Sequence, residues 1–206
     1  MKKETENVHT LKPLIDLCRE IDNKKPAYAW RYRRAYLGHL NNYWNFAVAL
    51  NRVYKEKSKK AEASMFEDNN ANDELISASI SFYFYIKICL DASRVLSDNT
   101  IYSTISDEKV ERLQKLRKEN KKMAQIISRI RNKVGAHPGD PNCLFVGDVS
   151  WGGVNDRVKF FAFDLRSMEM VKEKFELNPD EHLLKMKEYI NNLMGELRDC
   201  WGLVED

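Results

Sequence analysis

Apolar residues spaced three and four positions apart between 113 and 134 constrain this chain more than any other feature of its sequence. With roughly 100° of rotation per residue in a helix, one face carries Leu113, Leu116, Met123, Ile127, Ile130 and Val134. The pattern predicts an amphipathic helix, which we expect to be the longest regular helix of the chain. Gly135 favours a helix C-terminus, and Pro138 disfavours helical backbone at the residue before it. The helix should therefore end close to His137.

Arg131 lies on the apolar face of this predicted helix, although a solvated arginine normally lies on the opposite face. His137 follows six residues later, at the predicted helix end, so the two side chains could meet. Arginine is a permanent cation whose donors match the geometry of phosphate, and histidine can move a proton near neutral pH. A structural interpretation is also open, because basic residues stabilise helix C-termini and a long arginine can extend its charge into solvent.

The segment RNKVGAHP, from Arg131 to Pro138, resembles the motif of the HEPN superfamily and is most similar to its abortive-infection and toxin-like branch. The motif covers seven residues, and the expected helical layout extends the resemblance to about the length of a domain. The resemblance implies a metal-independent endoribonuclease whose catalytic residues are Arg131 and His137, in a site usually completed across a homodimer. Many active members carry a tyrosine two residues after the histidine, which a nucleotidyltransferase antitoxin modifies. This chain has Gly139 there.

RNA cleavage without a metal uses the 2′-hydroxyl group of the substrate as the nucleophile. His137 suits the proton transfer because its ordinary pKa lies near the working pH. Arg131 could stabilise the negative phosphorane with two donors, and Asn132 could orient one of them. Asp91, a carboxylate within an apolar run, could support Arg131, although pairing with a basic neighbour in its own segment is equally open.

The charge of the 206-residue chain is unevenly distributed behind a formal net value of +3. The segments 24–60 and 108–134 carry ten basic residues each against one and three acidic ones, whereas the segment 173–206 carries four basic and nine acidic residues. Two basic helices and an acidic tail indicate a polyanionic partner such as RNA. An alternative interpretation is that the two basic segments are solvent-facing helix surfaces and that the acidic tail offsets their charge.

The chain shows no spacing typical of a metal centre. Its cysteines, Cys18, Cys89, Cys143 and Cys200, are widely separated, without paired Cys or His spacing. We therefore expect neither a metal nor another cofactor. The first residues lack the apolar region of a signal peptide, and no apolar run approaches the length of a membrane span, so we expect a cytoplasmic protein without membrane contact.

The segment 26–57 is expected to be a helix with two apolar stripes. The first contains Tyr32, Tyr36, His39, Tyr43, Phe46, Leu50 and Val53, and the second contains Leu37, Leu40, Trp44 and Ala47. A helix that is apolar over so much of its circumference packs between other helices or between subunits. The tyrosines and nearby arginines could form a base-stacking surface, but we expect them to be core and rim.

Four further segments complete the prediction of the fold. Residues 77–88 alternate as a strand does, but the apolar run continues to Leu96, which is long for a strand, so we predict a buried helix. Residues 143–163 contain two short strands around a turn at 151–155, and residues 164–177 are predicted to form a short helix. The last helix begins at 178–181 with strong capping signals, and His182 in its first turn should be exposed.

These observations predict an all-α bundle of about four or five main helices, forming a single domain over residues 1–206 with a small β-hairpin inserted at 143–163. The leading hypothesis is a HEPN-like endoribonuclease of a phage-defence or toxin–antitoxin type, whose partners are RNA, a second copy of the chain and an antitoxin protein. One alternative is a non-catalytic helical module of the same fold that binds RNA or a partner protein. Another is a structural homodimer in which Arg131 only pairs with Asp91 or Asn120.

Overall fold

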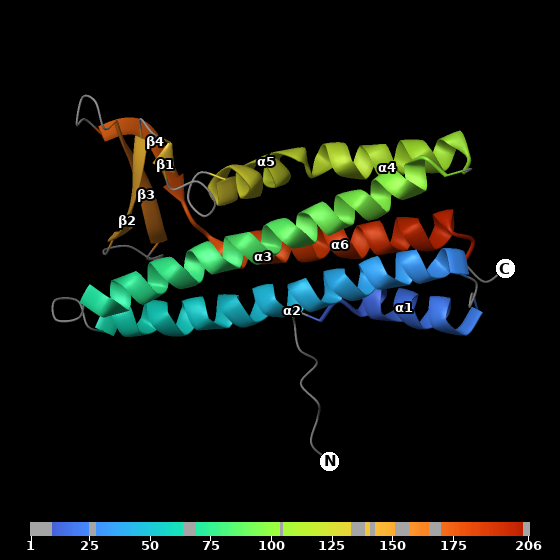
Figure 1. The fold of residues 1–206 in the computed structure, drawn as a ribbon, viewed down its shortest axis with the longest axis horizontal. Coiled ribbons are helices and arrows are strands. Elements are labelled where there is room, and N and C mark those ends of the chain that lie inside the picture. The colour runs from blue at the N-terminus through green and yellow to red at the C-terminus, as the bar shows by residue number, and fades with distance from the viewer. Residues whose placement is uncertain are drawn as a thin grey trace, which may run out of the picture. The chain divides into compact units, whose positions relative to one another are not determined.

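The structure is a computed structural model, and it describes residues 10–24, 28–63, 69–103, 105–132, 139–140, 143–150, 157–164 and 170–203. Within these residues six helices make up most of the fold (Figure 1). They are α1 (Lys12–Lys24), α2 (Tyr28–Ala63), α3 (Asn69–Ile101), α4 (Asp107–Glu119), α5 (Lys121–Ile130) and α6 (Pro179–Cys200). The predominantly helical class predicted from the sequence is therefore confirmed.

The chain divides into two compact units, each built from segments that are far apart in the sequence. The first unit contains Met1–Trp44, Ile88–Lys122 and Leu184–Asp206, and the second contains Asn45–Lys87 and Met123–Leu183. Helices α2, α3, α5 and α6 contribute residues to both units, because the boundaries fall inside them. The single domain expected from the sequence stays a prediction.

In the first unit, α1 lies beside the N-terminal part of α2 (Figure 1), and the Arg34 guanidinium donates to the Asp22 carboxylate at 2.9 Å. The buried apolar side chains of the first unit include Leu14, Leu17, Leu37, Leu40, Trp44, Leu90, Leu96, Leu113, Leu116, Leu193 and Leu197. The guanidinium carbon of Arg33 lies 4.7 Å from the ring centre of Trp30 and 4.8 Å from that of Trp201. These contacts join segments from opposite ends of the described chain.

The helix predicted to be the longest in the chain is interrupted at Asn120. Helices α4 and α5 have 13 and 10 residues, whereas α2 and α3 have 36 and 33. The Asn120 side chain donates from Nδ2 to the Leu116 carbonyl at 2.9 Å, and such a bond competes with the continuation of a helix. The apolar stripe is confirmed as far as the described residues extend, because Leu113, Leu116, Met123, Ile127 and Ile130 are buried. Val134 lies outside the described residues.

The two apolar stripes of α2 lie in different environments. The stripe of Leu37, Leu40, Trp44 and Ala47 is buried, whereas Tyr32, Phe46 and Val53 of the other stripe are exposed. Tyr36 and Tyr43 of this stripe are half-buried, so of the core and rim positions expected for the tyrosines, these two take rim positions and none of the three lies in the core. Both stripes have helical spacing, so the spacing could not select the one that packs. The hydroxyl groups of tyrosines favour positions that keep contact with water.

Helix α3 confirms that the alternating segment at 77–88 is helical. Its buried hydroxyl groups on Ser79, Ser93 and Thr100 each donate to the carbonyl four residues earlier, at 2.8 Å, so a continuous helix satisfies them. By length and composition, Asp73–Ile101 could also cross a membrane, with half of its apolar window buried inside the protein. The expectation that no apolar run reaches this length is wrong, although the core helix of a protein without a membrane meets the same criterion.

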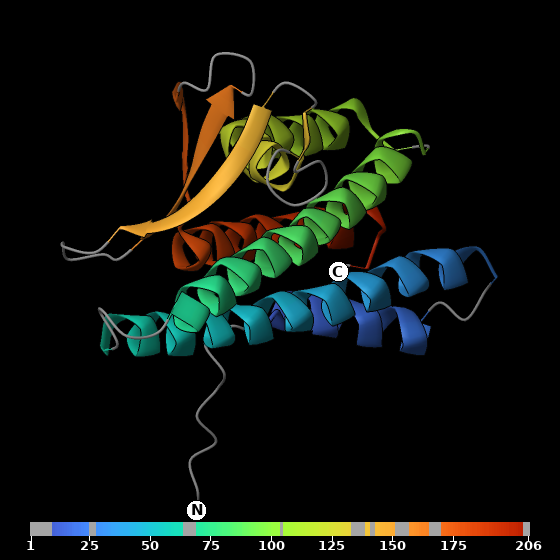
Figure 2. The same cartoon turned by 60° about the vertical axis from the view of Figure 1, so that its left-hand side comes forward.

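Four strands follow α5 and precede α6 along the described chain, and they form one antiparallel sheet (Figure 2). They are β1 (Gly139–Asp140), β2 (Cys143–Ser150), β3 (Arg157–Asp164) and β4 (Met170–Glu176), in the order β1-β2-β3-β4. The β2–β3 pairing runs from Cys143 opposite Asp164 to Ser150 opposite Arg157. The insertion is thus larger than the small hairpin expected at 143–163, because β1 and β4 extend it on both sides. The turn expected at 151–155 lies outside the described residues.

The short helix predicted at 164–177 is wrong where the structure describes this segment. Strand β4 occupies the position and pairs with β3, from Lys159 opposite Glu176 to Phe163 opposite Met170. Its lysine and glutamate residues are good helix formers, so local propensity alone favours a helix here. Pairing with a neighbouring strand supplies backbone hydrogen bonds that a local propensity cannot anticipate.

Helix α6 begins with the capping arrangement expected from the sequence. Asn178 Oδ1 accepts a hydrogen bond from the Glu181 backbone N–H at 3.2 Å, and Asn178 Nδ2 donates to the Glu181 carboxylate at 2.8 Å. Pro179 occupies the first helical position, where its missing N–H costs nothing. These two hydrogen bonds between Asn178 and Glu181 therefore stabilise the first turn of α6.

Replacing Asn178 with alanine should lower the free energy of unfolding by about 1 kcal/mol, because the first turn loses its capping oxygen. Urea unfolding followed by circular dichroism would measure this. Asn178→Asp should recover most of the loss. The matched control is Asn192→Ala, in an exposed position on the same helix, which should change stability little. Equal stability of Asn178→Ala and the wild type would show that the cap is unimportant.

Candidate functional site

Arg131 and Asn132 directly follow the last residue of α5, and the backbone there forms a wider, π-type turn. Such turns are frequent at functional sites. Arg131 is half-exposed, and its Nη1 donates to Asn132 Oδ1 at 3.1 Å. An orienting role for Asn132 needs a contact of this kind, and the role itself stays a prediction.

The Arg131 guanidinium also lies over an aromatic ring of α3. Its central carbon is 5.9 Å from the centre of the Phe84 ring, within the range of a cation–π interaction. Neither this ring nor the neutral amide of Asn132 cancels the charge of Arg131. Among the described residues no carboxylate pairs with Arg131. The guanidinium therefore keeps donors and a positive charge for an anion such as phosphate.

The structure does not test the placement of the other two predicted site residues, His137 and Asp91, relative to Arg131. His137 lies outside the described residues, so its pairing with Arg131 stays a prediction. Asp91 is exposed on α3 and belongs to the first unit, whereas Arg131 belongs to the second. Its supporting role also stays a prediction.

A buried hydrogen-bond network in the second unit was missed by the sequence analysis. His182, expected to be exposed, is only 7% exposed. Its Nδ1 lies 2.6 Å from the hydroxyl oxygen of Tyr83, which also accepts the Asn178 backbone N–H at 3.1 Å. Because the Tyr83 oxygen accepts from Asn178, its own proton is available for His182 Nδ1.

The protein environment strongly favours the neutral form of Tyr83. Burial raises the pKa of the Tyr83 hydroxyl well above its ordinary value, and the hydrogen bond from Asn178 only partly offsets this. The Tyr83 hydroxyl therefore stays protonated across the physiological pH range. A polar side chain in the first turn of a helix gives little sign of such burial in a sequence, because the partner lies 99 residues away.

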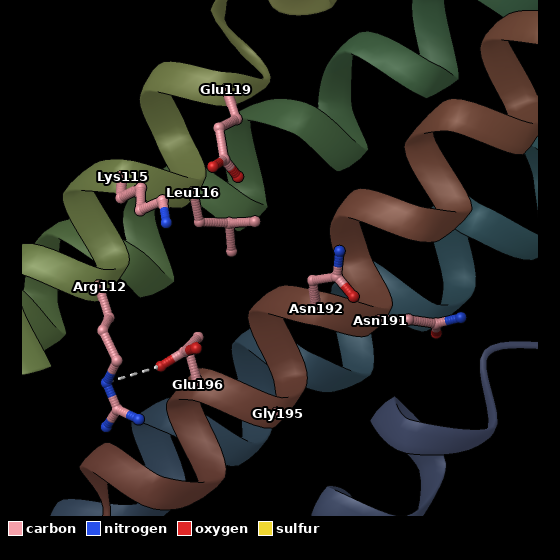
Figure 3. A pocket seen from close by; sticks show the side chains of 8 residues that line it. All are labelled: Arg112, Lys115, Leu116, Glu119, Asn191, Asn192, Gly195 and Glu196. Atoms are coloured by element: carbon pink, nitrogen blue, oxygen red, sulfur yellow. Dashed lines mark ion pairs between the residues drawn. The ribbon is translucent and has the colours of Figure 1, made fainter.

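A polar pocket of about 490 Å³ lies between α4 and α6 in the first unit (Figure 3). It is lined by Arg112, Lys115, Leu116, Glu119, Asn191, Asn192, Gly195 and Glu196. Figure 3 shows Lys115, Glu119 and Asn192 directed into the space, whereas Asn191 points away from it. Arg112 Nε lies 3.4 Å from a Glu196 carboxylate oxygen. This mixture of charges selects no single class of ligand.

Arg112 is further engaged by Asp199 next to the pocket. The two side chains form a hydrogen-bonded ion pair, and the Arg112 guanidinium holds the pKa of the Asp199 carboxyl below its ordinary value. The arginine is thus shared between two carboxylates of α6. A guanidinium engaged in this way has less charge to offer an external anion than Arg131 has.

The cysteines behave as expected of small core residues. Cys18 and Cys89 are buried, and Cys200 is half-buried. Burial raises the pKa of the Cys18 and Cys89 thiols, which disfavours the reactive thiolate. Among the described residues, no group of three or more His, Cys, Asp or Glu side chains is arranged to hold a metal ion.

Comparison with known proteins finds no protein-family model, no curated protein and no solved structure that matches this chain. The resemblance to the HEPN superfamily therefore depends on the Arg131–His137 motif and on the helical layout.

Proposed function

We propose that this chain is a metal-independent endoribonuclease similar to those of the HEPN superfamily, acting in phage defence or as a toxin. The observation that carries the proposal is the state of Arg131 at the end of α5. Its guanidinium is half-exposed, contacts Asn132 and Phe84, and has no carboxylate partner among the described residues. An arginine that keeps its donors for an anion, followed six residues later by a histidine, has the residue types needed for phosphate ester cleavage.

The reaction needs one displacement at phosphorus and two proton transfers. A base removes the proton of the 2′-hydroxyl group while the 2′-oxygen attacks the adjacent phosphorus. The bond to the 5′-oxygen breaks, and the leaving oxygen takes up a proton. We assign proton transfer to His137 and stabilisation of the negative phosphorane to Arg131. The products are a 2′,3′-cyclic phosphate and a 5′-hydroxyl end.

The proposal includes RNA and a second copy of the chain as partners. The basic segments 24–60 and 108–134 would attract the phosphate backbone, so binding should weaken steeply as salt is added. A second copy would complete the site, as the resemblance implies, and an antitoxin protein would control it. The Gly139 position argues against control by nucleotidyl transfer to a tyrosine there.

Incubation with RNA in the presence of EDTA tests the proposed reaction. We expect ordinary RNA to be cut and the same sequence with 2′-O-methyl groups to stay intact, because methylation removes the nucleophile. Gel electrophoresis of end-labelled RNA would resolve the products. Cleavage of both substrates, or of neither, would contradict the proposal.

A non-catalytic module that binds RNA or a partner protein is the second candidate. Its specific support is the exposure of two large rings, Phe46 and Phe84, in the second unit. Exposed apolar groups of this size often mark interaction surfaces. This candidate requires that RNA binding survives His137→Ala and that no cleavage product forms.

A further inference from the structure

Aromatic side chains of α2 and α3 form a continuous row on the surface of the second unit. The Phe46 and Tyr85 rings have their centres 5.2 Å apart and are inclined by 30°, and the Phe84 and Tyr85 rings lie edge to face at 5.4 Å. Phe46 is 53% exposed and Phe84 is 42% exposed. We call Phe46, Tyr85 and Phe84 the aromatic row.

Arg131 continues the aromatic row at its Phe84 end. Three helices therefore supply the side chains, with Phe46 on α2, Phe84 and Tyr85 on α3, and Arg131 just after α5. Positions on packed helices hold side chains more firmly than positions on loops do. The surface thus offers partly exposed aromatic rings and, directly beside them, a guanidinium that no described carboxylate neutralises.

We propose that the aromatic row binds unpaired bases of a single-stranded RNA while Arg131 contacts the adjoining phosphate. This inference rests on the proposed function and specifies its substrate as a single strand. Aromatic side chains stack on any exposed base, and arginine adds charge and cation–π attraction. Bases inside a duplex have no free face, so the aromatic row cannot stack on them.

The charge of the surrounding segments favours RNA over a second copy of the chain as the occupant. Residues 45–59, 73–87 and 123–132 carry seven basic and three acidic side chains. Two of these basic side chains, Lys57 and Lys55, form ion pairs with Glu74 and Asp180. If the aromatic row paired with itself in a symmetric dimer, the same basic segments of the two copies would face each other. A phosphate backbone instead supplies the opposite charge.

The test measures binding of a fluorescent single-stranded RNA that carries 2′-O-methyl groups, because this probe cannot be consumed by the proposed cleavage. Phe84→Ala should weaken binding about 5- to 100-fold, from the loss of one stacked base, in a fluorescence anisotropy titration. Phe84→Trp should retain binding. The matched control is Tyr102→Ala, which removes a ring that is 86% exposed elsewhere in the chain and should bind as the wild type does.

Equal binding by wild type and Phe84→Ala would overturn the inference, and so would equal affinity for a duplex of the same length. Loss of self-association by Phe84→Ala in sedimentation, with probe binding unchanged, would assign the aromatic row to a contact between copies and also overturn it. If the probe binds through Phe84 but ordinary RNA stays intact, the inference stands and the proposed cleavage fails. The two proposals are therefore separable.

Discussion

Replacing His137 with alanine should reduce the rate of RNA cleavage by about 10²- to 10⁴-fold, the range typical of a lost general acid or base. Arg131→Ala should cost about 10²- to 10³-fold, as loss of a donor to a developing negative charge does. Arg131→Lys should recover only part of this, because a lysine keeps the charge without the fork of donors. Single-turnover rates with end-labelled RNA would measure all three effects.

Arg129→Ala is the matched control for Arg131→Ala. Arg129 is exposed on α5, two residues before Arg131, and its removal takes away the same charge from the same helix. We expect it to change cleavage only through general attraction to RNA, by a few-fold at most, an effect that added salt should remove. If Arg129→Ala and Arg131→Ala slow cleavage equally, Arg131 has no special role. Circular dichroism should show that each variant is folded.

Tyr83→Phe should lower the free energy of unfolding by about 2–4 kcal/mol, because one missing hydroxyl leaves two groups without their partner. These are His182 Nδ1 and the Asn178 backbone N–H, which both contact the Tyr83 oxygen. The phenylalanine ring keeps the packing, so the loss reports the hydrogen bonds. Urea unfolding would measure it.

Tyr102→Phe is the control for Tyr83→Phe, since it removes a hydroxyl from a highly exposed tyrosine. It should leave stability within about 0.5 kcal/mol of the wild type. If Tyr83→Phe is equally harmless, the network does not stabilise the second unit. Tyr83→Phe should also leave the cleavage rate close to that of the wild type at temperatures where the variant is folded.

Alkaline pH should remove part of the stability that Tyr83 contributes. Burial raises the pKa of Tyr83 in the folded protein, whereas an unfolded tyrosine ionises near pH 10. The contribution is complete below about pH 10 and falls as the pH rises, because the unfolded chain releases the proton first. The difference in unfolding free energy between the wild type and Tyr83→Phe should shrink by up to about 1.4 kcal/mol per pH unit above that value. A difference that stays constant would contradict this linkage.

The helices were predictable where local signals agreed with the final packing. The apolar run through 77–96 was too long for a strand, and α3 is helical there. The Asn178 and Glu181 side chains cap α6 as their spacing indicated. In both cases residues close in sequence supply the stabilising contacts.

The errors arose where distant residues decided the outcome. The Tyr83–His182 contact joins α3 to α6, and β4 is a strand because β3 pairs with it. The two stripes of α2 had equivalent spacing, so only the folded arrangement distinguishes the buried Trp44 from the exposed Phe46.

The candidate site was predictable only in part. The sequence placed Asn132 next to Arg131, and the two side chains are in contact. The cation–π contact with Phe84 was not anticipated, because Phe84 lies 47 positions earlier on another helix. Its interaction with Arg131 links the proposed catalytic arginine to the aromatic row.

The chemistry of the RNA ends tests the central claim most directly. Purified wild-type protein is incubated with an RNA of defined sequence in the presence of EDTA, and the masses of the products are measured by mass spectrometry. If Arg131 and His137 promote attack by the 2′-hydroxyl group, each cut leaves a 2′,3′-cyclic phosphate and a 5′-hydroxyl end, and His137→Ala leaves the RNA intact. Ends with a 3′-hydroxyl and a 5′-phosphate, or cleavage that persists undiminished in His137→Ala, would contradict the claim.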